Sequence, residues 1–218
     1  MALDLSLNCV AMNRHMSNGF TLLELMVTIF VVAILISVGV PGFVRTIQTS
    51  RMASSTNDLV TSIHRARSEA VKRRVPVTLC ASNNPLAPAP ACNVGGNMVG
   101  WVVFVDDADI DGNGQPDGNI VIDPGEIILE AHGALPAQLT VSSDAAFISF
   151  TSNGFRRNGP AGPAATMILF CDDRGNVDQG GSGSAARMLM IGVTGRPQVG
   201  RDVDDVNFAL TQLGGTCP

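Results

Sequence analysis

Residues 19–44 read GFTLLELMVTIFVVAILISVGVPGFV and decide the fold class of this chain. No charged residue interrupts the apolar run from Leu25 to Val44. As a helix that rises about 1.5 Å per residue, this run is about 30 Å long, which matches the hydrocarbon core of a bilayer. Glu24 lies just inside the apolar segment, where an ionised carboxylate is costly unless a cation neutralises it. The segment therefore predicts a membrane-spanning helix with one acid that needs a partner.

Cleavage between Gly19 and Phe20 would supply that partner, because the new α-amino group would lie about one helical turn from Glu24 or near the Glu24 of a neighbouring copy. The glycine followed by Phe-Thr-Leu-Leu-Glu-Leu and an apolar helix resembles the prepilin signature of type IV pilins and type II secretion pseudopilins. The resemblance implies that a prepilin peptidase cuts after Gly19 and methylates Phe20, and that Glu24 pairs with the N-terminal amine of an adjacent subunit. It also implies an inner-membrane assembly platform and other pilin or pseudopilin subunits as partners.

Two other interpretations of the same segment are weighed. An ordinary secretory signal peptide has a shorter apolar region, with a small-residue cleavage site after it rather than before it. A plain signal anchor could carry a glutamate by chance. Residues 1–11 hold an acid and no base, which is unusual for the cytoplasmic end of a membrane segment. We therefore expect translation to begin at Met12 or Met16 rather than at Met1.

The chain of 218 residues has room for one helix and one globular domain. Hydrophobic residues make up 45% of it and charged residues 15%, so the part outside the membrane is expected to bury a core. The net charge of −5 argues against a uniformly basic nucleic-acid binder. The expected organisation is a leader (1–19), a transmembrane and filament-core helix (20–44), an amphipathic half of the same helix (45–75) and a periplasmic β-rich domain (76–218).

The amphipathic half of the helix shows an apolar stripe at helical spacing that faces a core. The stripe consists of Met52, Thr56, Leu59, Ile63, Ala66 and Ala70. Between these positions, charged residues can remain in solvent. The helix is expected to end near Arg74, because Pro76 favours an extended conformation at Val75.

Everything beyond the helix is predicted as β structure, in short runs of β-branched and apolar residues between turn residues. The runs are 75–81, 100–105, 126–131, 146–151, 166–171 and 187–194. The motifs GWVVF, FTSNG, FCDDRG and TGR, in this order, resemble the minor-pilin and pseudopilin H family, the FimT, FimU and GspH group. The resemblance implies an α+β, type IV pilin-like fold, in which a long N-terminal helix packs on an antiparallel β domain.

Four cysteines follow the leader, which itself holds Cys9, and an even number in a domain delivered outside the cytoplasm favours disulfides. Four cysteines allow three connectivities. We predict Cys80–Cys92, which closes a short Pro-rich loop, and Cys171–Cys217, which ties the C-terminus to a strand. A zinc site is disfavoured because the sequence has no CxxC pair.

An alternating acidic segment, DADIDGNGQPD, raises the question of calcium, whose oxygen ligands come from alternating positions around a tight glycine turn. The candidate ligands are Asp109, Asp111, Asn113 and Asp117. Ile120 stands where a calcium loop has its bidentate glutamate, and no helix precedes the segment, so a solvated hairpin turn is the alternative. No other cofactor is expected.

Charge is segregated along the chain: residues 106–130 hold acids and no Lys or Arg, whereas residues 45–74 are rich in bases. Complementary faces of this kind could dock neighbouring subunits; the alternative is that both are solvated. In the FimT branch a C-terminal Gly-Arg-x-Arg element is associated with binding DNA. Here Gly195-Arg196-Pro197-Gln198 keeps one arginine of that element, and Arg187, Arg196 and Arg201 are the candidate phosphate contacts.

No catalytic constellation stands out around His15, His64 or His132. The sequence therefore predicts a structural protein: a minor pilin or pseudopilin, with a DNA receptor of natural transformation as the alternative. Its expected location is the bacterial inner membrane, with a single span and the globular domain in the periplasm or on a filament.

Overall fold

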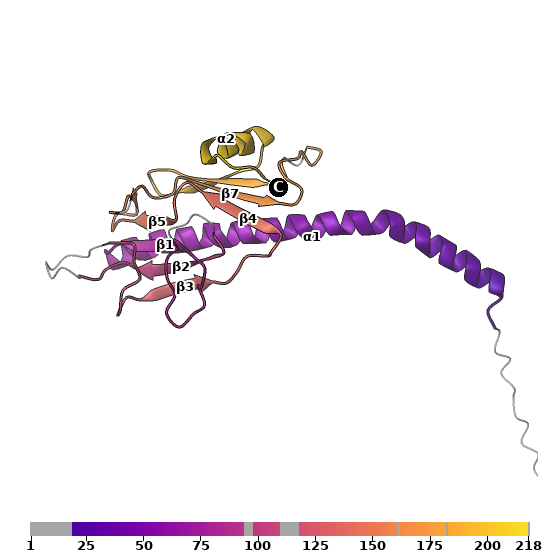
Figure 1. Ribbon diagram of the computed structural model, residues 1–218, viewed down its shortest axis with the longest axis horizontal. Helices are drawn as coiled ribbons and strands as arrows, with labels where there is room; N and C mark the ends of the chain where they lie inside the picture. The colour runs from indigo at the N-terminus through magenta and orange to yellow at the C-terminus, as the bar shows by residue number, and fades with distance from the viewer. Residues whose placement is uncertain (1–18, 94–97, 110–117, 161, 182, 218) are drawn as a thin grey trace, which may run out of the picture. The chain divides into compact units, whose positions relative to one another are not determined.

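The computed structural model describes residues 19–93, 98–109, 118–160, 162–181 and 183–217, and only the backbone of Val38. The chain divides into two compact units, residues 1–45 and 46–218. Helix α1 (Leu22–Arg73) contributes its N-terminal part to the first unit and its C-terminal part to the second. The described strands and the second helix all lie in the second unit (Figure 1).

Helix α1 continues through Pro41 and ends where the sequence predicts, within one residue. Local contacts end the helix. Arg74 adopts a left-handed conformation with φ 62°, and its amide donates to the carbonyl of Ala70 at 2.9 Å. This conformation is the usual stop signal of a helix, although glycine commonly occupies it. The predicted apolar stripe is confirmed, since its members Met52, Thr56, Leu59, Ile63, Ala66 and Ala70 are all buried.

Two antiparallel sheets pack with the C-terminal part of α1 around one hydrophobic core. The first sheet has the order β3 (Ile128–His132), β2 (Gly100–Val105), β1 (Val77–Ser82), β5 (Phe147–Phe150), β6 (Arg156–Arg157). The second has the order β4 (Leu139–Ser143), β7 (Met167–Asp172), β8 (Arg187–Ile191), β9 (Pro197–Gly200). This arrangement confirms the α+β, pilin-like fold class predicted from the sequence.

Strand β1 is buried on both faces, which explains its nearly continuous apolar sequence. Leu79 belongs to the main core beside α1, whereas Cys80 belongs to a smaller cluster on the opposite face. The other buried members of that smaller cluster are Val102, Phe104, Ile120, Phe147 and Ala164. The first sheet is therefore the middle layer between α1 and the segments that cover its outer face.

Helix α2 (Val203–Leu213) corrects the prediction that residues 76–218 form β structure throughout. It packs on the outer face of the second sheet through Val206 and Ala209, beside strands β7 and β8 (Figure 1). The helix signals were present in the sequence: acids at Asp204 and Asp205 in the first turn, an apolar spacing of three, and Gly214 at the C-cap with φ 63°.

Each predicted strand is present, β2 with the predicted bounds and the others with ends shifted by a few residues, but β4, β6 and β9 were not predicted. Strand β4 buries only Val141, so its sequence lacks a clear apolar face. Strand β6 is two residues long, and β9 begins with a proline, which cannot donate to a ladder and therefore occurs mainly in edge strands. These strands form because neighbouring strands offer hydrogen-bond partners, and not because their own sequences favour a strand.

Both predicted disulfides are present. Cys80 and Cys92 are bonded with a Cα–Cα distance of 5.5 Å, and Cys171 and Cys217 with 5.4 Å. The first bond fixes the Pro-rich loop after β1, and the second anchors the segment after α2 to β7.

Candidate assembly surfaces

The start of α1 presents the residues expected to matter for processing. Gly19 and Phe20 are exposed, and Phe20 has 80% of its surface accessible. The amide of Glu24 donates to Thr21 Oγ1 at 3.2 Å, so Thr21 caps the helix. Glu24 lies in the first turn, where the positive end of the helix dipole favours a carboxylate. This local role of Glu24 exists beside the predicted pairing with an N-terminal amine.

The apolar part of α1 is not covered by its own chain. Among the described residues, α1 is long enough and apolar enough to cross a membrane. The chain buries none of the residues in the most apolar stretch of this helix. Side chains such as Leu35 and Phe43 are about two-thirds exposed. An isolated helix with apolar residues all round requires another apolar environment, from lipid or from other helices.

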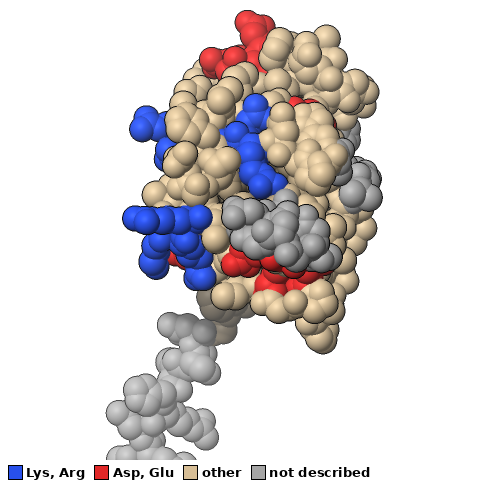
Figure 2. All heavy atoms as spheres, turned by 90° about the vertical axis from the view of Figure 1, so that its left-hand side faces the viewer, with Lys and Arg blue, Asp and Glu red and all other residues tan. Residues whose placement is uncertain are grey.

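The end of the basic segment and the start of the acidic segment lie close together, at the end of the second unit where α1 stops. The amide of Asp106 donates to the carbonyl of Pro76 at 3.0 Å, so the acidic segment begins beside the basic end of α1 at Arg73 and Arg74. Figure 2, which looks onto this end, shows basic groups next to acidic ones. At this end the two oppositely charged segments therefore share one surface, and farther along α1 Glu130 pairs with Arg65 at 3.2 Å.

Asp106 is buried within this end, with 1% of its surface exposed. Its carboxylate accepts from Thr78 Oγ1 at 2.8 Å and from the amide of Ile120 at 3.3 Å. Burial raises the pKa of Asp106, against the opposing effects of the Thr78 bond and the charge of Arg157. Ile120 has φ 70°, which is strained for a β-branched residue, and the Asp106 carboxylate holds its amide in place.

The arginines considered for DNA binding are not equivalent in the structure. Arg196 and Arg201 are exposed on either side of β9. Arg187 is buried, with 6% of its surface exposed, and its guanidinium donates to the carbonyls of Ser184 and Ala186. Burial also lowers the pKa of Arg187. The expectation that Arg187 contacts phosphate is wrong, because the side chain is buried and its Nη1 donates to carbonyls inside the fold.

The predicted calcium segment lies mostly outside the described residues, since 110–117 are not described. Within the described part of the chain, no group of three or more His, Cys, Asp or Glu side chains is arranged to hold a metal. Glu126, which follows this segment, accepts from the amides of Ala108 and Asp123 at 3.1 and 2.9 Å. Burial raises the pKa of Glu126. Calcium binding stays a prediction.

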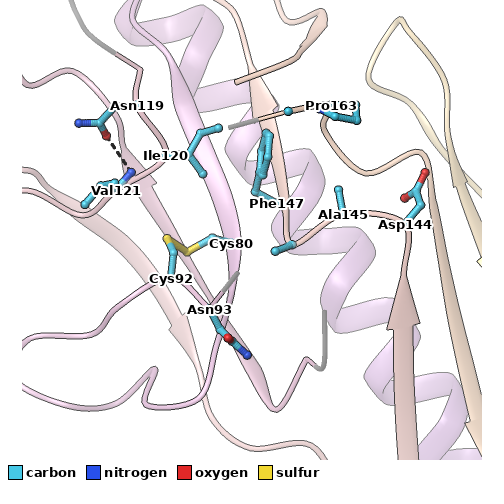
Figure 3. Close-up of a pocket in the computed structure, with 12 residues that line it drawn as sticks. Cys80, Cys92, Asn93, Asn119, Ile120, Val121, Asp144, Ala145, Phe147 and Pro163 are labelled. Atoms are coloured by element: carbon cyan, nitrogen blue, oxygen red, sulfur yellow. Dashed lines mark hydrogen bonds between the residues drawn. A yellow bond between two sulfur atoms is a disulfide. The ribbon is translucent and has the colours of Figure 1, made fainter. Parts of the chain in front are cut away.

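A pocket of about 330 Å³ opens on the outer face of the first sheet. Its walls carry Phe147, Ile120, Pro163 and the Cys80–Cys92 disulfide (Figure 3). Its polar side chains are already occupied. Asp144 accepts from the amides of residues 166 and 167, and Asn119 Oδ1 accepts from the amide of residue 121. The pocket thus offers an apolar surface without converging polar groups.

A second pocket, of about 360 Å³, lies between the residues that precede β2 and the segment that leads into β4. Gln138, which lies in the chain between the lining residues Ala137 and Leu139, accepts from Arg51 at 3.4 Å, so the pocket lies near the start of the buried stripe. The described lining is mostly apolar and comprises Met98, Val99, Leu135, Pro136, Ala137, Leu139, Thr140, Val141 and Ser142. Sequence reasoning missed this pocket because its two walls are about 40 residues apart in the chain.

Comparison with known proteins places these features in a family. The sequence model of the family described as type II transport protein GspH matches residues 55–195, and that of the prokaryotic N-terminal methylation motif matches residues 14–40. Two crystal structures of the type IV minor pilin FimU from Pseudomonas aeruginosa strain PAO1 are similar to the chain. One is 22% identical with a TM-score of 0.43, covering 69% of this chain and 89% of FimU. The other is 21% identical with a TM-score of 0.40, covering 68% and 91%.

No curated protein matches the chain. The GspH match nevertheless spans well over half of the residues and includes strands of both sheets as well as the buried stripe of α1 from Thr56 onward. The methylation motif covers the exposed start of α1, where Gly19, Phe20 and Glu24 lie. The chain therefore belongs to the GspH family of minor pilins and pseudopilins.

Proposed function

We propose that this protein is a structural subunit of a filament that is assembled from the bacterial inner membrane. The observation that carries the proposal is the uncovered apolar half of α1, which begins with the methylation motif. In the membrane, lipid would surround this segment, and in a filament, the helices of other subunits would replace the lipid. The globular unit would then be displayed in the periplasm or outside the cell.

Assembly begins with cleavage between Gly19 and Phe20 by a prepilin peptidase, followed by methylation of Phe20. The peptide bond at this position is exposed and precedes the first helical residue, Leu22, so a protease can reach it without unwinding α1. The new N-terminal amine then neutralises a Glu24 carboxylate in the apolar core of the filament, where either charge alone would be costly.

Intact-mass and N-terminal analysis of the membrane-extracted protein, with and without its prepilin peptidase, tests this processing. The proposal requires a chain that begins at methylated Phe20 only when the peptidase is present. An uncut chain, or a cut beyond Val44, would instead indicate a signal anchor or a secreted protein.

The role of Glu24 has its own test. Glu24→Gln removes the charge with little change in shape and is expected to leave membrane insertion intact while impairing incorporation into filaments. Thr21→Ala removes the helix cap and serves as the matched control, because it weakens the same turn without removing the carboxylate. Normal incorporation of Glu24→Gln would refute the assignment.

The more specific proposal is a minor subunit of a type IV pilus rather than of a type II secretion pseudopilus. The motifs Thr194-Gly195-Arg196 and Cys171-Asp172-Asp173-Arg174-Gly175 support this choice. Deleting the chain from its host should reduce piliation and twitching while leaving exported proteins in the medium. Loss of secretion with normal pili would reverse the choice.

A structural role is also what the titratable groups support. The four cysteines of the globular unit are consumed in disulfides, so none is a nucleophile. His132 stacks on Trp101, and His64 is exposed on α1. The DNA-receptor alternative is not favoured, because one of its three arginines is buried and Asp202 and Asp204 lie beside Arg201.

A further inference from the structure

Strand β4 forms one edge of the second sheet, because it pairs with β7 on one side and with no other described strand. Its pairing with β7 runs from Leu139 to Ser143 without a shift of register. An edge strand presents a row of unpaired amide and carbonyl groups, to which a strand of another chain can be added. The edge of β4 is therefore a place where a partner could extend the sheet.

The other three edges formed by the described strands carry features that oppose such pairing. The register of β3 against β2 shifts at Phe104, and β3 carries Glu130. Strand β6 consists of two arginines, and β9 begins with a proline. Bulges, charged side chains, short length and proline are the means by which native sheets keep an edge from pairing. The sequence of β4, Leu-Thr-Val-Ser-Ser, contains none of them.

The hydrogen bonding of β4 shows which of its groups face the free edge. The amide of Asp144 donates to the carbonyl of Met167 at 3.3 Å, in the register of the β4–β7 pairing. Bonded and non-bonded pairs alternate in an antiparallel ladder, so the backbone groups of Val141 and Ser143 point away from β7. No backbone hydrogen bond to these two residues from the free side is found within the described part of the chain.

A groove accompanies this free edge. It is the second pocket described above, of about 360 Å³, and residues 139–142 of β4 line it together with Met98, Val99 and residues 135–137. None of the described lining residues belongs to β7, so the groove lies on the side of β4 away from β7. None of them is charged either. The amide of Leu135 donates to the carbonyl of Val99 at 2.8 Å, which holds the two parts of the lining together.

We propose that β4 receives an extended strand of a different filament subunit, which adds to the second sheet and places uncharged side chains in this groove. In strand addition, backbone hydrogen bonds supply affinity and neighbouring pockets select the side chains. Here Val141 and Ser143 supply the backbone bonds. The inference rests on the proposed function, because a minor subunit has mainly other subunits as neighbours. It adds which surface of the chain meets them and what kind of segment it binds.

A proline at position 143 separates docking from folding. Because the Ser143 amide faces the free edge, Ser143→Pro removes a donor from the added strand without breaking a bond to β7. Ser143→Ala is the matched control. It loses the same side-chain bond, in which Ser143 Oγ donates to the carbonyl of Ala145, but keeps the amide. Circular dichroism and urea unfolding of the detergent-solubilised chains check that both variants fold.

Incorporation into sheared filaments is the first readout. Ser143→Pro is expected to reduce incorporation at least about tenfold, because a carbonyl of the added strand loses its donor at a buried contact. Ser143→Ala should remain near the wild type. Ser142→Lys, at an exposed position of β4, is a second variant that places a charge beside the groove and should have the same effect as the proline. Thr211→Lys, exposed on α2, is its control.

Photo-cross-linking identifies the occupant. A photoreactive amino acid replaces Ser142 in the full-length chain, and irradiation of assembling cells is expected to link it to a different pilin subunit. Adding Ser143→Pro should abolish this link, whereas adding Ser143→Ala should preserve it.

The outcomes separate this inference from the function on which it rests. If the wild-type chain is absent from filaments, the proposed function and the inference both fail. If it is present, but Ser143→Pro and Ser142→Lys incorporate like their controls, the function stands and the docking is overturned. If Ser143→Pro does not fold, Ser142→Lys decides. A link only to a second copy or to a protein outside the filament, or no link at all, also overturns the docking.

Discussion

Trp101 Nε1 donates a hydrogen bond of 2.9 Å to Ser62 Oγ, joining strand β2 to helix α1. The indole ring also stacks on His132, the cross-strand neighbour on β3, with ring centroids 3.8 Å apart. Ser62 Oγ in turn lies 2.5 Å from Glu130 Oε1. A buried polar group is costly without a partner, so this network fixes how α1 lies on the first sheet.

The Trp101–Ser62 contact predicts a measurable coupling energy. Trp101→Phe and Ser62→Ala should each destabilise the fold, and their double-mutant cycle should give a coupling of about 1 kcal/mol. Urea unfolding of the detergent-solubilised chain, followed by circular dichroism, provides the measurement. Ser68→Ala, on the exposed side of α1, is the control. Strictly additive effects would mean that the bond contributes nothing.

The two disulfides are expected to contribute unequally. Cys171 and Cys217 are 46 residues apart, and Cys80 and Cys92 are 12 apart. The chain-entropy argument gives about 4 kcal/mol for the longer loop and about 3 kcal/mol for the shorter one. Paired Cys→Ser variants compared by urea unfolding test the order. A larger loss for the Cys80–Cys92 pair would show that its place in the buried cluster outweighs loop entropy.

Asp106 predicts a distinctive pH dependence of stability. Because burial raises its pKa, the folded state holds the proton more tightly than the unfolded state does. The stability from this group is therefore present below the unfolded value near 3.8 and is lost as pH rises through the higher folded pKa. In Asp106→Asn this loss should disappear. The free energy of unfolding of both proteins is measured from pH 3 upward, and the difference between the two proteins is expected to change as the pH rises. A difference that stays constant with pH would contradict the prediction.

Replacing Arg74 by glycine is expected to stabilise the protein. The left-handed conformation at φ 62° costs a side-chain-bearing residue about 1 kcal/mol, and glycine avoids that cost. Arg74→Gly should therefore raise the free energy of unfolding by up to about 1 kcal/mol. Lys72→Gly, two residues earlier and inside α1, should lower it by about 0.5–1 kcal/mol. Destabilisation by both variants would indicate that the Arg74 side chain makes a favourable contact.

Calcium binding remains a separate prediction for residues 109–117. Calorimetry with millimolar calcium should detect heat that is reduced in Asp111→Asn, because each carboxylate ligand contributes charge to the site. Asp178→Asn, outside this segment, is the control. No heat in the wild type would leave the solvated hairpin turn as the interpretation.

The sequence by itself determined the features that depend on local pattern. The uncharged run from Leu25 to Val44 and the stripe from Met52 to Ala70 specify one long helix with two environments, since helical periodicity follows directly from residue order. The even number of cysteines after the leader and the short Pro-rich loop led to the correct disulfides. Helix α2 was within reach as well, since its acidic first turn and Gly214 are local signals.

Only the tertiary structure decided which distant segments share a surface. Arg187 and Arg196 look alike in the sequence, but strand pairing buries the first and leaves the second in solvent. The end of the basic segment and the start of the acidic segment came together because β2 ends beside the end of α1. Sequence periodicity cannot supply such information, because it specifies which face of an element is buried but not which element covers it.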